Sequence, residues 1–189
     1  MTRNLAEMQH SIDGIMVRLT ELTTDDAAEV IEIRNNPEYN RFLSNAGQEI
    51  KMENQINWTR KCKEENDNVN FKVLLNNNFA GTISLYDIDA NGKAEFGRYI
   101  VTHPIAAIES ELLLLQYGFE VLHLNEIVCK TVKKNTKVWQ QHSRLHFATI
   151  GADVDHRIGE ERVLQSMTRE HYLQTDFEPI REIIRKFNR

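Results

Sequence analysis

The segment 94–147 constrains the fold more than any other part of this sequence. It contains a strand pattern, AEFGRYIV, then His103-Pro104, an apolar helical run, ELLLLQYGFEVL, a second strand pattern, EIVCKTV, and the polar stretch KKNTKVWQQHSRLHF. A strand that returns to a sheet through a helix lies parallel to the strand before it. The segment therefore predicts a strand-helix-strand-helix unit, whose first strand ends where a helix N-terminus directs its free amides at a ligand.

The residues before this unit predict one strand followed by two helices. VRLTEL alternates like a half-buried strand, and Thr24-Asp25 is a capping signal for a helix that ends near Asn36-Pro37. Proline disfavours helical geometry in the residue before it, so the helix stops there. A second helix is expected around 52–65.

Two hairpins should connect these helices to the central unit. FKVLL and FAGTISLYDI flank Asn76-Asn77-Asn78, and Asn91-Gly92 precedes AEFGRYIV. Asparagine and glycine tolerate the left-handed backbone that tight hairpin turns require. These strands form an antiparallel meander, and the parallel return of EIVCKTV makes the predicted sheet mixed.

The C-terminal part predicts a hairpin and a helix. TIGADVDHRI and ERVLQSMT form the expected hairpin, and Ile180, Ile183, Ile184 and Phe187 repeat at helical spacing. This stripe is better explained by packing on the body or on a second subunit than by a membrane-surface helix. We expect a flexible leader at 1–14, one domain at 15–175 and a helical extension at 176–189.

Composition excludes several classes of function. A chain of 189 residues with 41% hydrophobic content can bury one ordinary core, and Lys+Arg 23 against Asp+Glu 28 gives a net charge of −5, which disfavours nucleic acid as a partner. Cys62 and Cys129 form neither a metal-ligand motif nor a disulfide framework, and no Cys/His cluster implies a metal. We expect a cytoplasmic protein without a membrane segment.

The span from about 17 to 172 resembles the GNAT acetyltransferases. The resemblance implies an α/β (α+β) fold with a mixed sheet of about seven strands flanked by helices, plus the extra C-terminal helix. Within it, IRNNPEYNRFL, FAGTISL, AEFGRYIV and VKKNTKVW are similar to the nucleotide-aminosugar N-acetyltransferases of pseudaminic-acid-type flagellin-sugar pathways. That similarity implies acetyl-CoA as co-substrate and a nucleotide-linked aminosugar as acceptor. A protein N-terminal acetyltransferase, a catalytically silent binding protein of the same fold, and an enzyme using another acyl carrier remain alternatives.

The segment that should bind the coenzyme's pyrophosphate departs from the family pattern. Here PIAAIESELL places Ile108 and Ser110 at the usual glycine positions, with Glu109 between them. A side chain held in a left-handed conformation would cost about 1–2 kcal/mol. At 4 Å, Glu109 would repel the pyrophosphate by about 1 kcal/mol in water and about 4 kcal/mol at an effective dielectric of 20. Alternatively, Glu109 and Glu111 only favour the positive end of the helix.

The resemblance also implies contacts for the rest of the coenzyme. The pantetheine arm should run beside the strand at Tyr99, Ile100 and Val101, whose side chains could equally be core. Asn135 starts the late helix and could contact the coenzyme as well as act as the helix N-cap.

Four residues are candidates for the chemistry and for binding the acceptor. His142 lies seven residues after Asn135, where the family often has a tyrosine that protonates the leaving thiolate. An imidazolium can donate this proton as well. Alternatively, a histidine in a polar helix is a solvated surface residue. Glu95 could accept the amine proton, or be a paired surface charge. Arg34 and Asn35 could bind a phosphate or a sugar hydroxyl, or form a salt bridge. A homodimer is possible.

Overall fold

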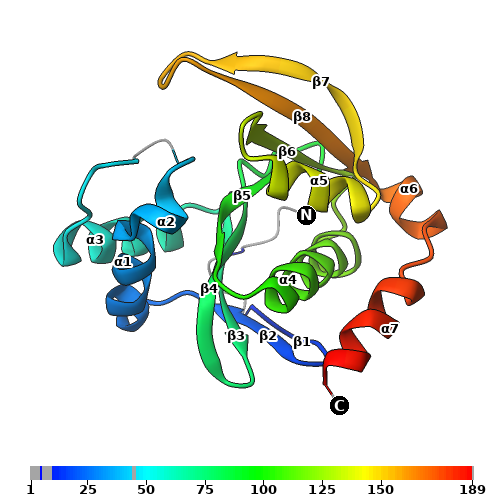
Figure 1. Cartoon of the computed structure of the whole chain (residues 1–189), viewed down its shortest axis with the longest axis horizontal. Helices are drawn as coiled ribbons and strands as arrows, with labels where there is room; N and C mark the ends of the chain where they lie inside the picture. The colour runs from blue at the N-terminus through cyan, green and yellow to red at the C-terminus, as the bar shows by residue number, and fades with distance from the viewer. Residues whose placement is uncertain (1–4, 6–9, 44–45, 189) are drawn as a thin grey trace.

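A single sheet of eight strands runs through the part of the chain that the structure describes, residues 5, 10–43 and 46–188 of this computed structural model (Figure 1). Its order is β1-β2-β3-β4-β5-β6-β8-β7, and only β5 and β6 pair in parallel. The predicted mixed sheet is confirmed. The strands are β1 (Ser11–Asp13), β2 (Val17–Glu21), β3 (Val69–Leu75), β4 (Asn78–Tyr86), β5 (Lys93–Val101), β6 (Glu126–Val132), β7 (Ala148–Asp155) and β8 (Glu160–Thr168).

Helices lie on both faces of this sheet (Figure 1). The first group comprises η2 (Thr24–Asp26), α1 (Ala27–Asn35), α2 (Pro37–Asn40) and α3 (Met52–Glu64). On the other face, α4 (Pro104–Gln116) continues as one π-helical turn, η3 (Tyr117–Val121). The remaining helices are α5 (Thr136–Arg144), α6 (Arg169–Gln174) and α7 (Glu178–Phe187).

The turns form where the sequence signals predicted them. Asn76 and Asn77 have φ values of 49° and 66° between β3 and β4, and Gly92 has a φ of 75° before β5. Helix α1 ends before Pro37, and the Asn36 side chain accepts a hydrogen bond of 2.9 Å from the Glu38 amide, which caps α2.

Helix α4 occupies the centre of the core and is buried on nearly all sides. Its leucines 112–115 are all buried, and it packs against β2, β3, β4 and β5. Two glutamates, Glu109 and Glu111, lie in the same helix and are also buried. Because a buried carboxylate needs hydrogen-bond or charge partners, their surroundings matter for the site described below.

Strand β1 and helix α7, near the two ends of the chain, pack on this body. Ser11–Asp13 pairs with β2, so this part of the expected flexible leader is a strand, and it is the strand that raises the total above seven. Residues 1–4 and 6–9 of that leader lie outside the described residues. In α7, Ile184 is buried against α4 and Ile180 packs on the core, whereas Ile183 and Phe187 are 47% and 66% exposed. Only one edge of the predicted stripe therefore packs on the body.

None of the described helices is both long enough and apolar enough to cross a membrane.

Candidate active site

The parallel strands β5 and β6 separate along their length and open a cleft. They pair from Lys93 with Glu126 to Phe96 with Cys129, and no further pairs follow. The peptide groups of 97–101 therefore have no strand partner on the β6 side. A cavity of about 180 Å³ lies at this opening, lined by β5, β6, α5 and the β7–β8 turn, with Phe42 and Leu43 from the segment after α2.

A bulge in β5 shapes the floor of this cleft. The register between β4 and β5 shifts between Thr82 and Ser84, and Arg98 has a left-handed φ of 49°. Gly81 allows the two strands to approach at this point, because it has a φ of 150° and an added Cβ would lie 2.0 Å from the Ile100 carbonyl oxygen. Gly81 lies opposite Val101 and Ser84 opposite Gly97, so the extra residue of the bulge falls between these two pairs.

Arg98 is held firmly on the cleft floor. Its guanidinium lies over the rings of Tyr86 and Trp58, 4.4 Å and 5.1 Å from their centroids, and donates to Asn70 Oδ1 at 3.0 Å. Burial and the nearby Arg98 charge lower the pKa of Arg34. Arg34 thus lies near this floor, although it does not line the cavity itself.

His142 and Glu111 form a buried pair on the wall of the cleft. His142 is 2% exposed and lines the cavity, and its Nδ1 lies 2.8 Å from Glu111 Oε2. Gln141 donates its amide to the other oxygen of Glu111 and also to the Tyr99 hydroxyl at 3.1 Å. Burial and the neighbouring Glu111 raise the pKa of Tyr99, which keeps this phenol neutral. The alternative of a solvated surface histidine does not fit this position.

Glu95 lies on the same cleft with two partners. Tyr86 donates its hydroxyl to Glu95 Oε1 at 2.6 Å, and Lys130 forms an ion pair with Oε2. Burial and the Glu95 charge raise the pKa of Tyr86, so the phenol remains a hydrogen-bond donor. Glu95 is therefore a paired charge, as the alternative to a catalytic role predicted. Both members of the pair nevertheless line the cavity.

The outer part of the cleft is rich in cations. Arg157 and Arg162 both pair with Asp155, and the Arg157 guanidinium lowers the pKa of that carboxyl. Past Phe42 and Ile158 the cleft continues into a second hollow of about 330 Å³, which includes Arg41 and Lys134. The two spaces share four lining residues, so together they can accommodate a substrate larger than a simple amine.

The start of α4 differs from the predicted pyrophosphate loop. The helix already begins at Pro104, so Ile108 and Ser110 lie inside it, and Ile108 is not among the described residues with positive φ. Ser110 is buried and donates to the Ala107 carbonyl at 3.1 Å. The predicted left-handed strain at Ile108 is therefore wrong.

Glu109 points away from the helix start. Its carboxylate accepts hydrogen bonds from the amides of Ile15, Met16 and Val17, the last at 3.1 Å, in the turn between β1 and β2. Burial raises the pKa of Glu109, and these three amides lower it in part. The prediction that its charge faces the coenzyme's pyrophosphate is wrong, because the side chain is committed to this turn.

The two ends of an acyl-coenzyme A fit this structure unequally. The thioester arm matches the open edge of β5, where peptide groups are available. At the start of α4, Pro104 has no N–H and the Ala107 amide bonds the His103 carbonyl at 2.9 Å, which leaves the amides of Ile105 and Ala106. No Lys or Arg occurs in 102–116. The chain thus presents few groups for a diphosphate at this point.

The cleft brings together part of the predicted site. Glu95, Tyr99, Asn135 and His142 all line it. Asn135 is the N-cap residue of α5 but makes no side-chain cap bond. Asn35 instead uses both ends of its amide to hold the Ile50 backbone, at 2.9 Å and 2.8 Å. The predicted residues that do not line the cleft are Arg34, Asn35, Ile100, Val101, Ile108, Glu109 and Ser110.

Sequence reasoning missed the residues that support the predicted ones. Glu111 had a usable signal, because a carboxylate directly before four leucines of a buried helix needs a partner. Arg98, Lys130 and Tyr86 had none, since each belongs to a strand that looks ordinary in sequence.

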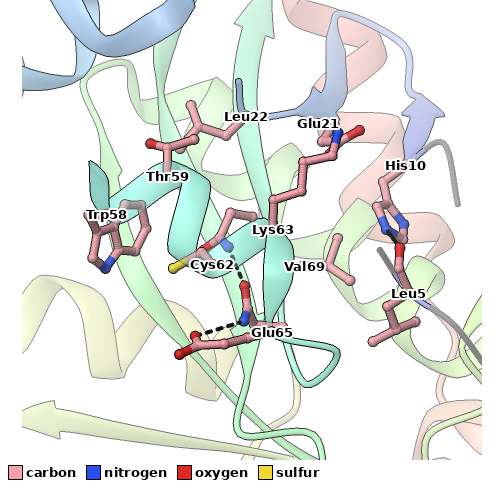
Figure 2. A pocket seen from close by; sticks show the side chains of 12 residues that line it. Leu5, His10, Glu21, Leu22, Trp58, Thr59, Cys62, Lys63, Glu65 and Val69 are labelled. Carbon is pink, nitrogen blue, oxygen red and sulfur yellow. Dashed lines mark hydrogen bonds and ion pairs between the residues drawn. The ribbon is translucent and has the colours of Figure 1, made fainter. Parts of the chain in front are cut away.

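Other candidate sites are weaker. No group of three or more potential ligands for a metal occurs among the described residues. Figure 2 shows a hollow beside α3 and β3, with His10 and Leu5 on one side and Trp58 and Cys62 on the other. Its volume of about 30 Å³ is that of a single water molecule, so it cannot hold a substrate.

Comparison with known proteins assigns the fold. Residues 17–148 match the model of the acetyltransferase (GNAT) domain, and no curated protein sequence matches. Among solved structures, apo FdhC, described as a nucleotide-linked sugar GNAT, is 22% identical over 92% of this chain and 98% of that chain, with a TM-score of 0.77. Spermidine N-acetyltransferase from Vibrio cholerae in complex with CoA and spermine is 19% identical over 84% and 98%, with a TM-score of 0.74. A GNAT-family acetyltransferase from Bacillus anthracis is 17% identical over 85% and 99%, with a TM-score of 0.74. With the family model covering more than half of its length, the chain belongs to the GNAT acetyltransferases.

Proposed function

We propose that this chain transfers an acetyl or other short acyl group from acyl-CoA to the amino group of a nucleotide-linked aminosugar. The observation that carries the proposal is the cleft between β5 and β6, with Glu95 and His142 on its walls and an edge of β5 that has no strand partner on the β6 side beyond Phe96. GNAT acetyltransferases take their acyl group from acetyl-CoA, which here would lie along that open strand edge.

The residues of the cleft can carry out each step of the transfer. The lone pair of the neutral amine forms the C–N bond at the thioester carbonyl carbon, and the C–S bond breaks. Glu95 accepts the proton from the amine, and His142 donates a proton to the sulfur, so that the amide and a free thiol are released. Solvent then returns the two groups to their starting protonation states. Holding the two reactants in line in the cleft supplies the rest of the rate increase.

The charges of the cleft favour an anionic acceptor. Arg98, Lys130, Arg157 and Arg162 line it, against Glu95 and Asp155. Guanidinium groups match phosphate geometry, whereas a polyamine would meet an excess of like charge. FdhC is described as a nucleotide-linked sugar GNAT, and the Vibrio cholerae neighbour was solved with spermine. The present charge pattern supports the first type of acceptor over the second.

A thiol-release assay with acetyl-CoA tests this proposal. The acceptors are a set of nucleotide-linked aminosugars, spermidine, and peptides with free N-termini. We expect turnover with the nucleotide sugars and a loss of at least about tenfold when the nucleotide is removed, because at least one charge-assisted hydrogen bond is then lost. Turnover on peptides alone would indicate a protein N-terminal acetyltransferase. Turnover on spermidine alone would refute the acceptor class.

A further inference from the structure

We propose that Glu111 is a positioning residue that orients the His142 imidazole, so that the Nε2 atom, directed at the cleft, exchanges the proton with the reacting thiol. This inference rests on the proposed function. It adds a residue of α4 to the machinery, and it assigns a role to each of the two ring nitrogens.

Glu111 is buried within a largely apolar helix. Glu111 is 0% exposed and lies in a helix whose neighbours in sequence are leucines. A buried carboxylate costs several kcal/mol unless it is paired and hydrogen-bonded. His142 and Gln141 of α5 supply one partner for each carboxylate oxygen. The two hydrogen-bond partners that α5 supplies therefore depend on the placement of that helix.

The orientation of the His142 ring is fixed by its neighbours. With Nδ1 donating to Glu111 at 2.8 Å, the exchangeable position is Nε2, which has no hydrogen-bond partner among the described residues. Phe96 meets the ring edge-on at a centroid distance of 4.9 Å, and Phe147 lies at 5.5 Å. The His142 ring is thus held in one orientation, and His142 also forms part of the cleft wall. A carboxylate that fixes tautomer and orientation is the recurring partner of catalytic histidines.

Other titratable groups surround the Glu111–His142 pair. The titratable neighbours are Tyr99 from β5, whose hydroxyl bonds Gln141, and Cys129 from β6. Burial, Glu111 and Glu95 raise the pKa of the Cys129 thiol, and Tyr99 also stays neutral. Glu111 is thus the anion that bonds the imidazole directly. His142 and Glu95, which is paired with Lys130, both line the cleft and are the two residues assigned to proton transfer there.

The transfer itself is balanced by this arrangement. The imidazolium gives its Nε2 proton to the thiolate as the C–S bond breaks. The neutral ring keeps the proton on Nδ1 and donates it in a hydrogen bond to Glu111. Without Glu111, the imidazolium loses its stabilising anion and the neutral ring is free to hold its proton on Nε2.

Kinetics of E111Q, H142Q and the double variant give one test. We expect each single variant to lose about 100-fold or more in kcat with little change in either KM, within the 10²–10⁴ range of general acid-base catalysis. The double variant should be no worse than the worse single variant, because residues that act as a unit are not additive. Independent, multiplicative losses would overturn the proposal.

A second measurement does not depend on activity. Imidazole ¹⁵N NMR of the wild-type protein should show the neutral His142 ring protonated on Nδ1, and E111L, which removes the acceptor, should move the proton to Nε2. The matched control is E109Q, a buried glutamate of the same helix that faces the β1–β2 turn; it should lose stability while leaving the His142 tautomer unchanged. A wild-type ring protonated on Nε2 would overturn the inference. Absence of transfer by the wild-type protein with the expected tautomer would instead refute the proposed function.

Discussion

Replacing Glu109 by alanine separates a structural role from a ligand-binding one. The carboxylate accepts from three amides of the β1–β2 turn, so its removal leaves Ile15, Met16 and Val17 without acceptors. An unsatisfied buried donor costs about 1–3 kcal/mol, and since Ile15 and Met16 are only partly buried, we use the lower end for each. The free energy of unfolding should therefore fall by about 3 kcal/mol, a large part of the 5–15 kcal/mol of a typical domain.

Urea unfolding of the E109A variant measures this loss directly. The control is E29A, an exposed glutamate of α1, which should change the free energy of unfolding by less than about 0.5 kcal/mol. The affinity of E109A for acetyl-CoA should equal that of the wild-type protein, because the charge never faced the donor. A tighter-binding E109A with unchanged stability would refute the reasoning and restore the sequence-based picture of electrostatic repulsion at the helix start.

Three further predictions follow from the same geometry. R98K keeps the charge but loses the guanidinium group that lies between Tyr86 and Trp58. The acceptor KM should therefore rise by about tenfold, while the donor KM stays within twofold. An unchanged acceptor KM would show that Arg98 does not belong to the acceptor site. Burial lowers the pKa of His10, and the Leu5 carbonyl and Glu21 oppose this effect less strongly. As the pH drops below about 6.5, the unfolded chain therefore takes up a proton before the folded one does, and the free energy of unfolding should fall. Denaturant unfolding of H10N should show a flatter dependence of this free energy on pH. G81A should lower the free energy of unfolding by about 2–4 kcal/mol, because its Cβ would clash with the Ile100 carbonyl. The control G47A, whose Cβ would have no atom within 4 Å, should lower it by about 1 kcal/mol. Equal losses in thermal unfolding would contradict the close approach of β4 and β5.

The sequence predicted most elements of the fold because local signals fix them. Asn76-Asn77 and Gly92 need left-handed turns, Pro37 stops a helix, and a strand that returns through α4 must be parallel. Pro104 was also a usable signal, since proline favours the first position of a helix, and it would have placed the start of α4 correctly.

The directions of the buried side chains could not be predicted in the same way. Glu109 and Glu111 are two residues apart on a helix that is buried on nearly all sides, so periodicity assigns neither to solvent nor to a particular neighbour. One bonds the β1–β2 turn and the other bonds α5. Likewise, the left-handed Arg98 depends on the pairing of β5 with β4, a long-range feature that its own sequence neighbourhood does not reveal.

Hydrogen exchange with a non-reactive acetyl-CoA thioether tests the central claim most directly, that the acyl donor lies between β5 and β6. Those amides of 97–101 that face β6 have no strand partner and should exchange more slowly when the ligand is bound, together with those of 130–132. Strand β3 pairs on both sides and should show no change. Protection at 97–101 is the predicted result; saturating ligand without protection there would contradict this location of the reaction.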